Sequence, residues 1–114
     1  MNYEDMSDFE INKEIAKSTD GDWHHSDGIV WKDDVEGFSK TFDPCNNPSD
    51  AWPIIIANNI SINHGKTLVN DEWVDIWFVG AGIPEAQERA TNSSKVLRAA
   101  MICFLKMKDA ENGR

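Results

Sequence analysis

The chain has 114 residues, of which 20 are acidic and 11 are basic, so its formal net charge is −9. This length suits one domain, residues 1–114, that buries about two-thirds of its unfolded surface. No apolar stretch approaches the roughly 20 residues that a membrane-spanning helix needs. The first ten residues carry four acids and no base, unlike a secretory signal peptide. We therefore expect a single cytoplasmic domain.

The negative charge is concentrated in the first third of the chain. Residues 1–36 contain 11 acids and 3 lysines, a net charge of −8, which leaves −1 for the other 78 residues. Such a surface repels nucleic acids and anionic membranes, so direct binding to either is not expected. It suits a basic partner, and we assign Asp33, Asp34 and Glu36 to the partner surface. The alternative is a solvated acidic face that keeps a small protein soluble.

The first predicted helix covers about residues 7–18. Ser7 and Glu10 have the spacing of a capping box, in which each side chain bonds to the other residue's backbone amide. The segment Gly28–Lys32 is rich in β-branched and aromatic residues and predicts a strand. Phe38–Phe42 alternates apolar and polar residues and suits a second short strand.

The middle predicted helix covers residues 50–59 and follows a run of turn-forming residues, 43–50. Asn47 or Ser49 is expected to cap it. Pro53 would then fall in the first turn, where a missing amide loses no helical hydrogen bond.

The second half of the chain predicts further strands. Ile60–Ile62 is expected to end a strand at a hairpin turn, Asn63–Lys66, and Asn70-Asp71 offers a further turn. Trp73–Val79 is the strongest predicted strand. Pro84–Ala90 is expected to form a short turn of helix.

The last predicted helix covers residues 94–109, with its cap at Ser93 or Ser94. Its apolar side chains spread over more than half of the helical circumference, so the helix should be buried on several sides. Together these elements predict an α+β fold, in which a mainly antiparallel sheet of three or four strands packs with about three helices.

No pattern of side chains predicts catalysis, so we expect a protein that is not an enzyme. The three histidines lack the spacing of a zinc half-site, and neither a metal nor a cofactor is expected. Cys45 and Cys103 are interpreted as reduced thiols. Cys45 has no histidine near it in sequence to activate it as a nucleophile.

Three segments of the chain carry a family pattern, namely the run from Phe42 to Ile55, the opening Ser7–Asn12 and the closing Leu97–Leu105. In these segments the chain resembles the NinX-like accessory proteins of lambdoid bacteriophages and their prophages. The chain departs from that pattern at residues 92–95, where Asn-Ser-Ser-Lys replaces a proline-led helix start. The pattern is also similar to the wider phage α-β-α sandwich domains. The resemblance implies a small sheet with helices on it, and a protein that acts inside a bacterial host; it implies no activity.

Two functions remain open. In the first, a phage accessory protein binds and modulates a host protein, such as a defence component, through its acidic surface. In the second, the protein sequesters a small molecule such as a nucleotide at the start of the middle helix, with the Trp52 ring stacking on the ligand. The residues predicted to bind in that pocket are Asn46, Asn47, Ser49, Asp50, Trp52 and Arg98.

Overall fold

The structure is a computed structural model that describes residues 2–19, 21–33 and 36–113. Its elements in chain order are η1 (Tyr3–Asp5), α1 (Asp8–Lys17), β1 (Trp23–Ser26), β2 (Ile29–Asp33), β3 (Ser39–Thr41), α2 (Pro48–Ala57), β4 (Ser61–Val69), β5 (Glu72–Gly80), β6 (Gln87–Ala90), η2 (Ser93–Lys95) and α3 (Val96–Glu111).

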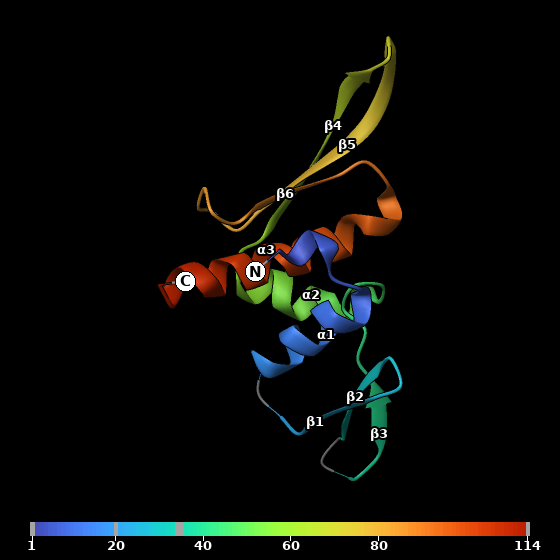
Figure 1. Cartoon of the computed structure of the whole chain (residues 1–114), viewed down its shortest axis with the longest axis vertical. Helices are drawn as coiled ribbons and strands as arrows, with labels where there is room; N and C mark the ends of the chain where they lie inside the picture. The colour runs from blue at the N-terminus through green and yellow to red at the C-terminus, as the bar shows by residue number, and fades with distance from the viewer. Residues whose placement is uncertain (1, 20, 34–35, 114) are drawn as a thin grey trace.

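The helices form a central layer between two small sheets (Figure 1). One sheet has the strand order β1-β2-β3 and the other β4-β5-β6, and every pairing is antiparallel. The predicted α+β class is therefore confirmed, but its strands form two sheets where one was expected. The molecule is elongated, 53 × 29 × 24 Å, because the two sheets extend from opposite sides of the helices.

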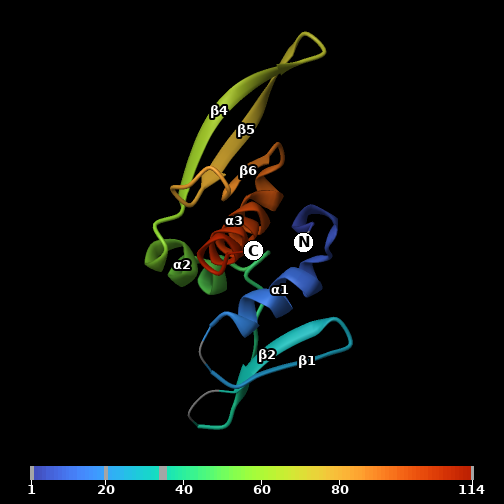
Figure 2. The ribbon, with the colours of Figure 1, turned by 60° about the vertical axis from the view of Figure 1, so that its left-hand side comes forward.

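The centre of the core is α3, as the sequence predicted. Residues 99–105 are each no more than 4% exposed. Seven consecutive buried residues cover the whole circumference of a helix, so α3 must have neighbours on all sides. It contacts α1 and α2 on one side and β5 and β6 on the other (Figure 2).

The helix caps confirm part of the prediction and correct the rest. Ser7 accepts a hydrogen bond from the backbone amide of Glu10, at 3.1 Å, and so caps α1. The middle helix begins at Pro48, two residues earlier than predicted, because Asn47 caps it and Pro48 fits its first turn. Pro53 consequently lies inside α2 and not in its first turn. Neither Ser93 nor Ser94 caps the last helix: Asn92 caps η2, and α3 follows it without a side-chain cap of its own.

Of the two turns predicted in this part of the chain, one was wrong and the other, at Asn70-Asp71, is confirmed. Residues 63–66 lie inside β4, and the hairpin turns at Asn70-Asp71, where both residues have a positive φ. Asn and Asp tolerate this left-handed backbone well, as a tight hairpin turn requires. Gly65 was misread as a turn former. It faces the Phe78 ring across the strands, and a Cβ there would lie 3.7 Å from that ring.

Two strands were not predicted. β1 pairs with β2 through a turn at Asp27-Gly28, with φ values of 50° and 80°. β6 occupies most of the segment predicted as a short helix, Pro84–Ala90, because its backbone pairs with the outer edge of β5. Within the described residues, none of the helices has the length and apolar character needed to cross a membrane.

Candidate functional site

The predicted binding residues Asn46 and Arg98 meet at one carboxylate, that of Asp8. Arg98 donates to Asp8 Oδ1 at 2.7 Å, and Asn46 donates to Asp8 Oδ2 at 3.1 Å. Arg98 also donates to the carbonyls of Tyr3, Glu4 and Met6. These bonds fasten the N-terminal segment and the turn before α2 to the central helix.

The Asp8 carboxylate keeps its charge within this cluster. Partial burial alone would raise the pKa of Asp8, but the hydrogen bonds from Asn46 and Arg98 outweigh that effect and lower it below the ordinary 3.8. The ion pair is half-buried, and the Arg98 side chain is 16% exposed.

The turn between β3 and α2 is held by its own polar groups. Asn12, which is buried, donates to Asp43 Oδ1 at 2.7 Å and accepts from the Cys45 amide at 3.2 Å. Asp50 accepts from the Asp43 amide at 2.9 Å, and Asn47 accepts from the Ser49 amide at 2.9 Å. These contacts explain the turn-forming run as a rigid corner. A ligand-binding role for these residues stays a prediction.

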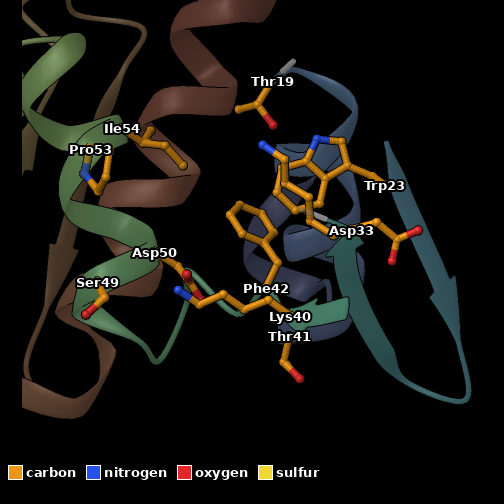
Figure 3. Close-up of a pocket in the computed structure, with 11 residues that line it drawn as sticks. Thr19, Trp23, Asp33, Lys40, Thr41, Phe42, Ser49, Asp50, Pro53 and Ile54 are labelled. Carbon is orange, nitrogen blue, oxygen red and sulfur yellow. The ribbon is translucent and has the colours of Figure 1, made fainter. Parts of the chain in front are cut away.

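A cleft of about 530 Å³ opens between α2 and the β1-β2-β3 sheet. Figure 3 shows Phe42 between Trp23 on the sheet and Pro53 and Ile54 on the helix. Ser49 and Asp50 also line this cleft, whereas Asn46 lines a smaller hollow near Asp8 and Phe9. Arg98 lines a third hollow beside Glu88. The structure therefore places only Ser49 and Asp50, of the six predicted residues, at this cleft.

Trp52 does not line the described part of the cleft. Its side chain is on the outer face of α2 and is 59% exposed. The tryptophan at the cleft is instead Trp23, which the sequence analysis missed together with its whole strand. The Asp27-Gly28 pair was the available signal, because a two-residue hairpin turn there fixes Trp23 opposite Lys32.

Of the three acidic residues assigned to a partner surface, the structure describes Asp33, at the end of β2, and Glu36, which precedes β3. Asp33 accepts from Ser39 Oγ at 2.7 Å and contacts His24 Nε2 at 3.1 Å. Glu36 is exposed. Asp34 lies outside the described residues.

The β4-β5 hairpin projects from the body as an arm (Figures 1 and 2). Near its tip, Leu68 and Trp73 are cross-strand partners on the same face. Leu68 is 53% exposed and Trp73 is 69% exposed, and Val69, which follows Leu68 and faces the other side of the hairpin, is also exposed. We call Leu68, Val69 and Trp73 the arm tip.

Both cysteines are buried and free. Burial raises the pKa of each thiol to about 12, which leaves almost no nucleophilic thiolate at neutral pH. Within the described part of the chain, no group of three His, Cys, Asp or Glu residues could hold a metal ion.

We expect both thiols to be inert in the folded protein. A disulfide reagent such as DTNB should label neither cysteine over minutes at pH 8, and should label both once urea unfolds the chain, because only unfolding exposes the sulfurs and returns their pKa to about 8.5. Stoichiometric labelling of Cys45 in the native protein would contradict its burial.

Fold and site together define a small α+β protein built around one buried helix, with an open cleft at one end and an exposed apolar arm at the other. The family model of Bacteriophage P22, NinX matches residues 2–108, and the chain belongs to that family of phage proteins. No curated protein and no solved structure matches the chain.

Proposed function

We propose that this phage accessory protein acts without catalysis, by binding a protein of its bacterial host in the cytoplasm. The observation that carries the proposal is the arm tip. A leucine, a valine and a tryptophan stand exposed at the end of a projecting hairpin, where they contribute little to the core.

Exposed aromatic and aliphatic side chains of this kind are typical of protein contacts. Tryptophan is enriched among the few residues that supply most of the binding energy of an interface, and grouped exposed apolar side chains mark interaction sites. The arm is therefore suited to insert Trp73 into an apolar pocket on the partner.

The acidic residues around the arm tip would face the residues that surround that pocket on the partner. Asp71 lies in the turn, and Glu72 and Asp75 lie on β5. Asp75 is also close to Lys66 Nζ, at 3.0 Å. With a net charge of −9 over the chain, the matching partner has basic residues around its apolar pocket, which also accelerates association.

The test is recovery of a host protein from bacterial lysate by the tagged chain, followed by affinity measurement with the purified partner. We expect Trp73→Ala to weaken binding about 10- to 30-fold, as loss of a central interface residue does. Trp52→Ala is the matched control, because it removes another exposed tryptophan from a different element, and it should leave the affinity unchanged.

The acidic surface is tested in the same assay. Reversal of Asp33, Asp34 and Glu36 to lysine should weaken binding and its salt dependence if that surface also faces the partner. Equal affinity of the wild type and Trp73→Ala, with a loss on charge reversal alone, would move the contact from the arm to the acidic turn. If neither variant weakened the binding of a captured partner, both the arm tip and the acidic surface would be refuted as the contact.

The alternative function, sequestration of a small molecule, is supported by one observation. The cleft lies beside the first half of α2, where the sequence predicted a pocket, and includes Ser49 and Asp50 from that prediction. The stacking side chain available there is Trp23 or Phe42, in place of Trp52.

A further inference from the structure

The cleft contains a row of three side chains that cross the small sheet from strand to strand. Trp23 of β1 is the register partner of Lys32 of β2, and Lys32 is the register partner of Lys40 of β3. Register partners share a face of the sheet, and all three line the cleft toward α2. Figure 3 shows Lys40 extending toward Asp50 on that helix.

Two lysines directly opposite one another are an unfavourable pair in a sheet. Within the described residues, no carboxylate forms an ion pair with Lys32 or Lys40. The two acids that line the cleft bond elsewhere, Asp33 to Ser39 and His24, and Asp50 to the Asp43 amide. The ammonium groups therefore have unused capacity for an anion.

The backbone turn before β1 brings one of these lysines close to the chain. Gly21 has a φ of +125°, and a Cβ on it would lie 2.6 Å from Lys32 Cε. Lys32 Nζ lies 5.0 Å from the centroid of the ring of Trp23, its register partner. This contact orients the cation without neutralising its charge.

The rest of the cleft wall is apolar. The Trp23 and Phe42 rings contact each other with centroids 4.3 Å apart, and Pro53 and Ile54 of α2 complete the wall. The Trp23 Nε1 atom is buried and has no hydrogen-bond partner among the residues that the structure describes. It lies on the Thr19 side of the ring (Figure 3). A buried N–H group without an acceptor is rare because it costs free energy. A ligand that placed an acceptor at that end of the cleft would remove this cost.

We propose that the cleft binds a small planar organic anion, a molecule with an aromatic ring and a phosphate or carboxylate group. Lys32 and Lys40 bind the anionic group, and the ring packs against Phe42 and the apolar wall. The cleft volume lies within the range of small-molecule sites. The residues of this site are separate from the arm tip, which lies at the other end of the molecule.

Calorimetric titration of the full chain at low salt tests the site with four probes. They are adenosine monophosphate, indole-3-carboxylate, adenosine and inorganic phosphate. We expect one or both aromatic anions to bind at least about 10-fold more tightly than adenosine and phosphate, since only they combine the two features of the cleft. Preference between the two aromatic anions distinguishes a phosphate site from a carboxylate site. Binding of adenosine or inorganic phosphate as tight as that of the better aromatic anion, or no binding of either aromatic anion, would overturn the proposal.

Variants locate the binding. Lys40→Gln should lower the affinity for the anion about 10-fold. The melting temperature of the ligand-free variant should rise by about 1–3 °C, because the repulsion between Lys32 and Lys40 is removed. Lys66→Gln is the matched control, since it removes the same charge from a strand of the other sheet, and it should bind normally. Wild-type affinity in both Lys40→Gln and Lys32→Gln would place the anion elsewhere and overturn the site.

Discussion

Replacing Arg98 by alanine should lower the free energy of unfolding by about 2–4 kcal/mol. The substitution leaves the Asp8 carboxylate half-buried without its cation, and it leaves the carbonyls of Tyr3, Glu4 and Met6 without their donor. Urea denaturation followed by tryptophan fluorescence measures the change. Arg98→Lys should recover only part of the lost stability, because an ammonium group cannot bond to the Asp8 carboxylate and to all three carbonyls at once.

The pH dependence of this loss follows from the lowered pKa of Asp8. A carboxyl whose pKa is lower in the folded state adds stability that is fully present above its unfolded value of about 3.8 and is lost as the pH falls through the folded value. The difference between the wild type and Arg98→Ala should therefore be constant near neutrality and should shrink below about pH 4. A difference that stayed constant down to pH 2 would show that the ion pair contributes nothing.

Replacing Met101 by alanine should lower the free energy of unfolding by about 2–5 kcal/mol. Met101 is fully buried in the middle of α3, and truncation there removes apolar contacts and leaves a cavity that the surrounding elements cannot fill. Thermal and urea denaturation should both report the loss. It is a large part of the 5–15 kcal/mol that stabilises an ordinary domain.

Met107→Ala provides the comparison for that result. Met107 is only partly buried, near the end of the same helix, so its truncation should cost clearly less. Equal losses at the two positions would contradict the view that the protein is organised around the middle of α3.

Local signals predicted the helices well. The Ser7 cap, the broad apolar surface of the last helix and the turn-forming run before α2 each depend on residues close together in sequence, and each corresponds to an observed element. The errors of one or two residues at the helix ends arose where several polar residues competed for the cap, as with Asn92 and the two serines after it.

Long-range pairing was the part that the sequence could not provide. The sequence of β6 is too short and too polar to distinguish a strand from a turn of helix. It forms a strand because its backbone pairs with the edge of β5. The separation of the strands into two sheets likewise depends on where the helices pass. The cleft was partly missed for the same reason, because Trp23, Lys32 and Lys40 come together only through strand register.

The position of α2 connects the cleft at one end of the molecule to the arm at the other. This helix forms one wall of the cleft and also contacts α3, and α3 in turn supports the base of β5. A molecule seated in the cleft that moved α2 would transmit that movement through densely packed side chains, which resist compression. The arm could then adopt a different orientation when the cleft is filled, so that a metabolite of the infected cell would adjust the capture of a distant protein.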